Sequence, residues 1–175
     1  MSGEAELRTE EDVRAVMVGL REAWERGDGE AYAASFSEEA QYVNAPGERV
    51  HGRKPIADSH QSIFDTVFKN TKLGRNYPSR IRQLTPEVVL VEAEGAVLFP
   101  GEREDDVAAN GLLTLVLLKQ GAAWRIESFQ NTPTGRFRKV NFISRYLLSR
   151  LRLFRAGWSR GGKHILDEKR RNVAV

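Results

Sequence analysis

Apolar positions recur with a helical period in the first part of the chain and with a period of two in much of the rest. Between residues 13 and 24 they lie three or four apart, and the polar, glycine-containing run 26–29 ends that helix. Thr9 and Asp12 resemble a capping box, so we expect the helix to begin there. A second, shorter helix is expected from Glu30 to about Phe36.

The clearest pattern covers residues 53–69, for which we predict an amphipathic helix with Pro55 in its first turn. With about 100° per residue, its apolar side chains fall within an arc of roughly 140°, and His60 lies in the middle of that arc. The imidazole therefore faces inward, either as a core histidine or as the titratable group of a closed site. The apolar arc consists of Ile56, Ile63, Phe64, Val67 and Phe68.

The rest of the chain predicts strands separated by turns. They are expected at residues 41–44, 49–51, 79–84, 88–99 with a bulge at Gly95, 112–119 and 123–132. Helices followed by an antiparallel meander indicate an α+β domain with the helices on one face of a curved sheet. The strand 112–119 is apolar on both faces, so its outer face needs a cover, and we predict a homodimer through that face.

Charge divides the chain into two parts, which we take as a domain of residues 1–135 and an extension of residues 136–175. The first part holds 15 Lys and Arg against 22 Asp and Glu, and the second holds 12 against 2. The net charge of +3 therefore conceals an acidic domain and a basic tail. Since the basic surplus is confined to the tail, charge does not point to nucleic-acid binding by the domain.

The composition also limits the compartment and the type of chemistry. There is no cysteine, which excludes disulfides, a thiol nucleophile and thiolate metal sites. The acidic start of the chain is unlike a signal peptide, and no apolar run approaches the roughly 20 residues of a membrane span. We therefore expect a cytoplasmic protein that uses no cofactor. No metal site is expected, since His51, His60 and His164 are scattered without carboxylates at ligand spacing.

The tail predicts a basic amphipathic helix over residues 140–155, in which apolar side chains recur at helical spacing between arginines. Three roles remain open for it. It can dock on the acidic core of its own or a neighbouring subunit, lie on an anionic membrane surface, or bind a partner protein or nucleic acid. The opposite charges of the two parts favour docking on the acidic core.

Four segments, in order, resemble the NTF2-like superfamily. Residues 22–28 resemble its helix ending W-x-x-G-D, and residues 36–47 resemble F-x-x-D-A-x-Y-V-N-x-x-G. Residues 52–64 resemble G-R-x-A-I-x-x-x-H-x-x-x-F, and residues 124–132 resemble the closing strand W-R-I-x-x-F-Q-N-T. Together they are most similar to the SnoaL-like branch called SgcJ/EcaC, which includes proteins of enediyne polyketide clusters, over about residues 8–134.

This resemblance implies an NTF2-like cone, or cystatin-like roll. A strongly bent antiparallel or mixed sheet wraps round three N-terminal helices, and an apolar pocket opens at one end; the C-terminal basic helix is additional. The superfamily includes isomerases, cyclases, hydrolases, dehydratases and proteins without chemistry, so the resemblance does not name a reaction. Its steroid isomerases use an Asp, a Tyr and a strand acid, whose positions hold Asn44, Leu20 and Leu115 here. That route is therefore not expected.

The candidate site combines one imidazole with amides and aromatic walls. His60 is the group that titrates near neutral pH, and Asn44 is its proposed catalytic partner, unless it only forms the turn before Pro46. Gln130 or Asn131 supplies a further amide, and period two puts Gln130 on the same face as Trp124. The substrate-binding walls are Trp24, Tyr32, Tyr42, Phe64 and Trp124. Trp24 and Trp124 also fit a purely structural role.

Three functions follow as hypotheses, and the first two require an enclosed apolar cavity into which His60 projects. The first is an isomerase, cyclase or hydratase that moves a proton on a hydrophobic, polyketide-derived intermediate. The second is a non-catalytic binder that shields such an intermediate from water. The third is an interaction module that is recruited through its basic tail.

Overall fold

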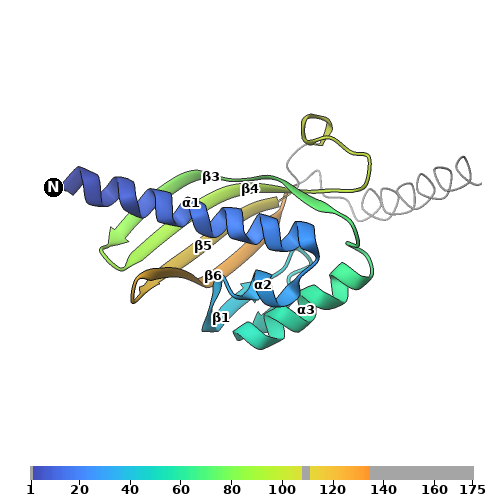
Figure 1. The fold of residues 1–175 in the computed structure, drawn as a ribbon, viewed down its shortest axis with the longest axis horizontal. Coiled ribbons are helices and arrows are strands. Elements are labelled where there is room, and N and C mark those ends of the chain that lie inside the picture. The colour runs from blue at the N-terminus through green and yellow to red at the C-terminus, as the bar shows by residue number, and fades with distance from the viewer. Residues whose placement is uncertain (1, 108–110, 135–175) are drawn as a thin grey trace, which may run out of the picture. The chain divides into compact units, whose positions relative to one another are not determined.

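In the computed structural model, which describes residues 2–107 and 111–134, helices lead the chain into a six-stranded sheet (Figure 1). The helices are α1 (Ser2–Arg26), α2 (Gly29–Ala33) and α3 (Arg53–Asp65), with a short 3-10 turn η1 (Glu104–Asp106). The strands are β1 (Phe36–Val43), β2 (Arg49–His51), β3 (Lys72–Thr85), β4 (Val88–Leu98), β5 (Gly111–Gln120) and β6 (Ala123–Pro133).

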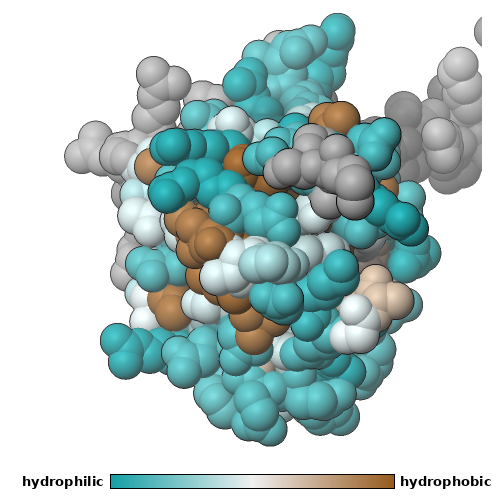
Figure 2. All heavy atoms as spheres, turned by 90° about the vertical axis from the view of Figure 1, so that its left-hand side faces the viewer, coloured by the Kyte–Doolittle hydropathy of each residue, from teal (hydrophilic) through white to brown (hydrophobic). Residues whose placement is uncertain are grey.

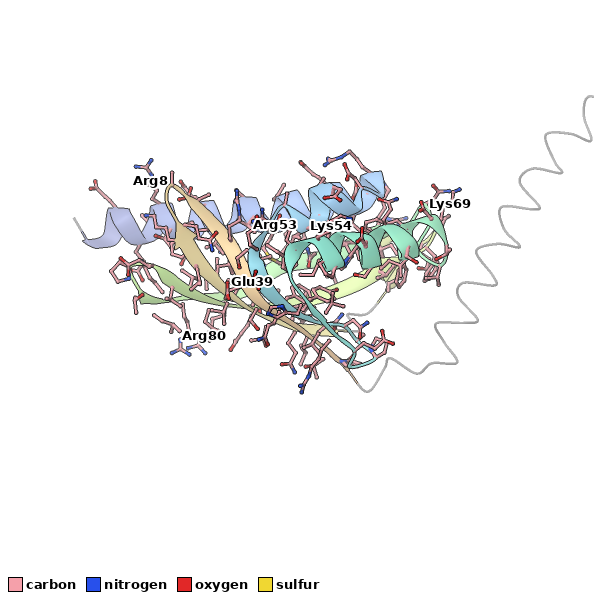
Figure 3. All side chains as sticks on the ribbon, turned by 90° about the horizontal axis from the view of Figure 1, so that it is seen from below. Arg8, Glu39, Arg53, Lys54, Lys69 and Arg80 are labelled. Carbon is pink, nitrogen blue, oxygen red and sulfur yellow. The ribbon has the colours of Figure 1, made fainter. Side chains whose placement is uncertain are left out.

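The strands are ordered β2-β1-β6-β5-β4-β3 across the sheet. β1 and β6 run parallel, and every other neighbouring pair is antiparallel. The three α-helices lie on one side of the curved sheet, and Arg80 of β3 projects from the opposite side (Figure 3). The predicted α+β architecture, a mixed curved sheet packed against N-terminal helices, is therefore confirmed.

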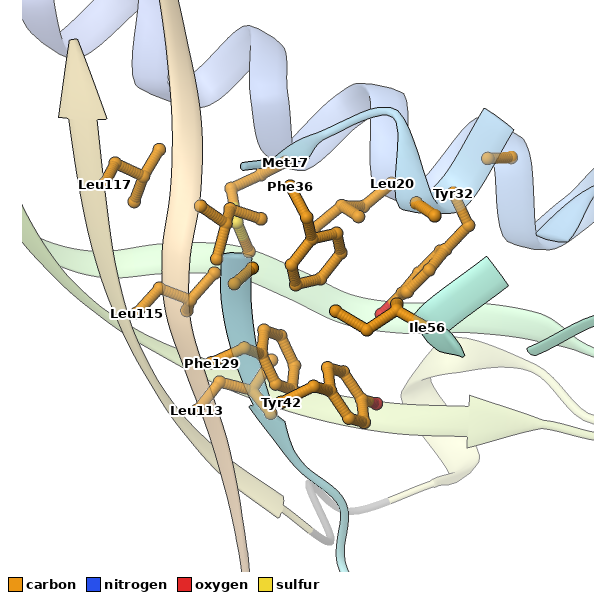
Figure 4. Close-up of a cluster of buried hydrophobic side chains, with 14 of the residues drawn as sticks. Met17, Leu20, Tyr32, Phe36, Tyr42, Ile56, Leu113, Leu115, Leu117 and Phe129 are labelled. Carbon is orange, nitrogen blue, oxygen red and sulfur yellow. The ribbon is translucent and has the colours of Figure 1, made fainter. Parts of the chain in front are cut away.

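The hydrophobic core fills the space between the helices and the inner face of the sheet (Figure 4). On β5, Leu113, Leu115 and Leu117 are buried, whereas the alternate residues between them are partly or fully exposed. Most of the apolar stripe that predicted α1 is also buried here, with Val16 only partly so. Leu20 and Leu115, two of the positions compared with steroid isomerases, are both core residues. Burial of these side chains, each contributing about 1.5–3 kcal/mol, positions the helices on the sheet.

The boundaries of the helices differ from the prediction at three places. α1 begins at Ser2 rather than near Thr9, because residues 4–8 before Thr9 all favour a helix. α2 ends at Ala33 rather than near Phe36. Phe36 is instead the first residue of β1, where it pairs with Ile126 of β6, and its side chain is fully buried. α3 begins at Arg53 as predicted but ends at Asp65; the chain then turns, and the amide of Phe68 donates to the Ile63 carbonyl at 2.8 Å.

The bulge expected at Gly95 lies on the neighbouring strand. Gly74 pairs with Ala96 and Tyr77 pairs with Glu94, so the extra residue belongs to β3. Arg75 there takes a positive φ of 53°, and its amide donates to the Glu104 carboxylate at 2.6 Å. Gly95 itself pairs regularly with Gly111, so the prediction placed the bulge on the wrong strand.

The predictions for residues 136–175, including the basic helix and its contacts, lie outside the described residues. Within the described part of the chain, no helix is both long enough and apolar enough to cross a membrane.

Candidate functional site

His60 projects from α3 into the core, as its place on the apolar arc predicted. Its side chain is 2 % exposed. Nδ1 lies 2.8 Å from the carbonyl oxygen of Ile56, one helical turn earlier, and 3.4 Å from the hydroxyl of Ser59. Nε2 is buried and has no hydrogen-bond partner among the described residues. One ring nitrogen is therefore fixed by the helix, while the other is buried and unpartnered in the described structure.

Four aromatic rings surround the imidazole. The ring of Tyr32 stacks on it with a centroid distance of 4.1 Å, and Tyr42 meets it edge to face at 5.0 Å. Phe64 and Trp24 approach it at 5.9 and 6.3 Å. The structure thus brings together five of the predicted site residues as a cluster in which the rings contact one another. The enclosed apolar cavity beside the imidazole stays a prediction.

Two further rings extend the cluster along the inner face of the sheet. Phe129 of β6 stacks on Tyr42 at 4.7 Å, and Phe36 of β1 lies within 6.1 Å of Phe129 (Figure 4). Neither was predicted as a site residue. Phe36 and Phe129 lie in two of the segments that resemble the superfamily, but nothing in their spacing distinguishes a ring beside the site from an ordinary core residue.

Burial controls the charge of this cluster. It lowers the pKa of His60 to about 4, although the hydrogen bond to Ile56 opposes the shift. Burial also raises the pKa of Tyr42 to about 12 and that of Tyr32 well above its ordinary value. All three side chains are therefore neutral at physiological pH. No carboxylate, lysine or arginine is buried among the described residues, so the interior is polar only through neutral groups.

Trp24 is held in place by a hydrogen bond that the sequence did not suggest. Its indole N–H donates to the Thr71 hydroxyl at 3.0 Å, and that hydroxyl donates to the Phe68 carbonyl at 2.7 Å. The ring of Phe68 lies 5.3 Å from that of Trp24 and is only partly buried. The turn after α3 thus covers one side of the cluster and is fastened to α1.

Asn44, the predicted catalytic partner of His60, forms hydrogen bonds within the turn between β1 and β2. Its side-chain oxygen accepts from the amide of Glu48 at 2.8 Å, and its side-chain nitrogen donates to the Glu48 carboxylate at 2.8 Å. Its backbone amide and carbonyl also bond within the turn. Both ends of the amide are therefore occupied by the turn, which is the structural role that the sequence left open.

Gln130 and Asn131 exchange the places expected from alternation, because β6 contains a bulge. Val116 pairs with Ser128 and Leu117 pairs with Ile126, so Glu127 is the extra residue. Beyond it Phe129 is buried, Gln130 is exposed, and Asn131 has a buried Oδ1 without a partner in the described structure. The preference for Gln130 is therefore wrong, and Asn131 is the amide at the inner face.

Trp124, the remaining residue predicted to line the site, lies outside the ring cluster around His60. It lies at the start of β6 beside a hollow of about 420 Å³ between α1 and the β5–β6 turn. The hollow is bordered mainly by small side chains, with Asp12 and Arg125 among its lining residues. Figure 2 shows the end of the molecule where α1 begins, where hydrophobic atoms form a strip between polar ones. Trp124 shares no ring contact with the His60 cluster in the described structure.

The described cluster is better suited to binding a ligand than to catalysis by a charged side chain. Its components are a neutral imidazole, two phenols, a buried amide oxygen and apolar rings. No group of three or more His, Asp or Glu side chains in the described ranges is arranged to hold a metal ion. Such a site can bind a hydrophobic molecule by stacking, and it can accept or donate a small number of hydrogen bonds.

Comparison with known proteins identifies the family and the fold. The family model of the SnoaL-like domain matches residues 13–131. A Nostoc punctiforme domain of unknown function with a cystatin-like fold is 29% identical, with a TM-score of 0.66, and the match covers 93% of this chain and 96% of that one. No functionally curated protein matches the chain.

Two more distant structures share the fold. An uncharacterised cystatin-like protein from Caulobacter vibrioides is 23% identical, with a TM-score of 0.61 and coverage of 75% of this chain and 93% of that one. Aln2 from a Streptomyces species is 13% identical, with a TM-score of 0.60 and coverage of 73% of this chain and 91% of that one. At these identities the likeness concerns the fold alone.

Proposed function

Because the chain belongs to the SnoaL-like domain family, we propose that the interior of its cone binds a hydrophobic small molecule and that His60 holds it through a hydrogen bond. The observation that carries this proposal is the Nε2 atom of His60, which is buried without a partner among the described residues. An unsatisfied buried polar atom costs about 1–3 kcal/mol, and a ligand that reaches it recovers that cost.

We place the ligand in secondary metabolism, as a polyketide-type molecule. The support is the resemblance of four segments to the SgcJ/EcaC branch and the size of the aromatic cluster, which suits a flat, conjugated molecule. In this proposal a cytoplasmic domain of residues 1–135 carries the binding function. Residues 136–175 are a separate basic extension.

Proton transfer by His60 is the second candidate function. Its free Nε2 lone pair supports it, because a general base needs an unoccupied nitrogen inside the site. Against it stands the lowered pKa of about 4, far below the value that suits a base at neutral pH. The turn also occupies the amide of Asn44, the expected partner. Binding without chemistry is therefore the function that we favour.

The rings around His60 contact one another, so we expect a side chain to move when a ligand enters. Phe68 is the best candidate for this movement. It lies on the turn after α3 rather than in a helix or strand, and it is only partly buried against Trp24. Displacing it would uncover Trp24, whose ring lies 6.3 Å from that of His60.

Binding of a neutral bicyclic aromatic, 2-methoxynaphthalene, tests whether the cone binds a hydrophobic molecule, since this ether has no hydrogen to donate to His60. In two-dimensional amide NMR spectra, we expect shifts at Tyr42, His60 and Phe129. Phe68→Ala should raise the affinity several-fold, because the ring no longer has to be displaced. Leu7→Ala, a change at an exposed apolar side chain of α1, is the matched control and should leave affinity unchanged. Shifts confined to the hollow beside Trp124, or no shifts at all, would refute binding in the cone.

The same proposal includes a homodimer through the outer face of the sheet. Leu90 pairs with Val116 and Val88 with Leu118, which places an apolar strip across β4 and β5. Leu112 on this face is 49 % exposed. Exposed charges of both signs lie nearby, on Arg80 and Arg82 of β3 and on Glu92 and Glu94 of β4, so a second copy can offer opposite charges.

Val116→Lys should convert this dimer into a monomer, because a charge at the centre of the apolar strip would be buried unpaired. Sedimentation velocity of both proteins at matched concentrations measures the change. Leu7→Lys introduces the same charge at another exposed apolar position and should leave the dimer intact. A wild-type protein that sediments as a monomer would remove the dimer from the proposal.

A further inference from the structure

The tautomer of His60 follows from its helix. A carbonyl oxygen can only accept a hydrogen bond, so at 2.8 Å from the Ile56 carbonyl the Nδ1 atom must carry the hydrogen. In the neutral ring Nε2 then holds a lone pair and no proton. Since Nε2 is buried and unpartnered in the described structure, it presents an acceptor, and not a donor, to the interior of the cone.

A second unpartnered acceptor lies on the same inner surface. The Oδ1 atom of Asn131 is buried without a partner among the described residues. It fits there because Gly111 faces it across the strand pair, and a Cβ added at Gly111 would lie 2.5 Å from this oxygen. Any other residue at position 111 would therefore displace the amide, so the glycine makes room for it.

A continuous row of rings connects the two acceptors. His60 contacts Tyr42 at 5.0 Å, and Tyr42 stacks on Phe129 at 4.7 Å. Asn131 follows Phe129 by two residues on the same side of β6, beyond the bulge. One elongated molecule lying along Tyr42 and Phe129 can therefore approach both acceptors.

Two phenol groups lie beside the imidazole. The ring of Tyr32 stacks on it at 4.1 Å, and the ring of Tyr42 meets it at 5.0 Å. Burial raises the pKa of both hydroxyls, so both are protonated at neutral pH. A protonated phenol can donate and accept, so it can pair with the hydroxyl group of a ligand.

We infer that the interior of the cone selects neutral ligands that carry a hydroxyl group, such as phenols or enols, and rejects carboxylates of the same shape. This inference rests on the proposed function, since it describes what the bound molecule must offer. Two acceptor atoms that have no hydrogen-bond partner in the described structure favour a ligand that brings hydrogen. An anion would meet two lone pairs and, among the described residues, no buried cation, so its loss of hydration would not be compensated.

Three probes of one skeleton test the inference at neutral pH: 2-naphthol, its methyl ether 2-methoxynaphthalene, and 2-naphthoate. Calorimetric titration should show that the naphthol binds about tenfold more tightly than the ether, the gain expected of one hydrogen bond to a buried acceptor. The naphthoate should bind more weakly than either. Equal affinities for naphthol and ether, or the tightest binding for naphthoate, would overturn the inference and the hydrogen bond to His60, and would leave binding of a hydrophobic molecule in the cone standing.

Variants test which residues cause the preference for naphthol over its ether. His60→Leu should make naphthol and ether bind alike while the ether still binds, since only the acceptor is lost. Asn131→Ala should reduce the ratio of the two affinities, whereas Gln130→Ala, next to it but exposed, should keep the wild-type ratio. An unchanged ratio in both His60→Leu and Asn131→Ala would exclude these acceptors. Failure of every probe to bind wild type would overturn the proposed function, and the inference with it.

Discussion

Acidification from pH 7 to pH 4.5 should lower the free energy of unfolding by roughly 2–3 kcal/mol through His60 alone. Burial lowers the pKa of this histidine from 6.5 to about 4 in the folded protein. Between these two values the unfolded chain binds a proton that the folded protein excludes. Protonation therefore favours unfolding, and the stability from the neutral ring is complete above about pH 6.5 and is lost as the pH falls toward 4.

Urea denaturation at a series of pH values measures this effect. His60→Leu should flatten the curve between pH 6.5 and 4.5, because it removes the group that titrates. His51→Gln is the matched control, since His51 is exposed at the surface near Glu39, and this variant should retain most of the wild-type slope. If His60→Leu kept the full loss of stability, the proton would be binding elsewhere and the buried, neutral imidazole would be refuted.

Gly29→Ala should destabilise the protein by about 1–3 kcal/mol, the usual cost of forcing a methyl group into a packed contact. A Cβ at Gly29 would lie 2.5 Å from the Ala57 carbonyl oxygen and 2.8 Å from the Gln61 amide nitrogen. Both are backbone atoms of α3, so neither can rotate away. The amide of Gly29 also donates to the Gln61 side chain at 3.0 Å, and separating the helices would weaken that bond.

Thermal unfolding and urea midpoints of Gly29→Ala can be compared with those of Gly19→Ala. At Gly19, in the middle of α1, the nearest atom to an added Cβ is the Ser35 hydroxyl at 4.0 Å. There the substitution should raise stability by up to about 1 kcal/mol, because alanine favours the helix. Because α2 and α3 carry Tyr32 and His60, Gly29→Ala should also weaken binding of 2-methoxynaphthalene. Equal effects of the two substitutions would contradict the close contact between α2 and α3.

The sequence was most informative where one local signal determines the structure. The polar run after Trp24 correctly predicted the end of α1. Pro55 and the apolar arc predicted α3 closely enough to place His60 on its inward face. Each of these features depends on neighbours within a few residues, which hydrophobic periodicity reports directly.

Features that depend on distant neighbours were not predicted. Ser37 holds the Glu127 bulge, since its hydroxyl lies 3.0 Å from the Ile126 carbonyl and also contacts the Glu127 carboxylate. These partners are about ninety positions apart in the chain, so alternation alone assigned the wrong amide to the interior. Thr71 and the closeness of the rings around His60 were missed for the same reason, because packing is decided by the complete fold.

The supernumerary residue in β6 also has a consequence for how such a binding surface tolerates change. A deletion of one codon at Glu127 would restore simple alternation, because Ile126 and Phe129 would then lie two positions apart and both would still face the cone. The asparagine at 131 would stay inside and the glutamine at 130 toward water. Loss of one residue at this point can thus be absorbed by the strand, while the ligand contacts beyond it stay the same.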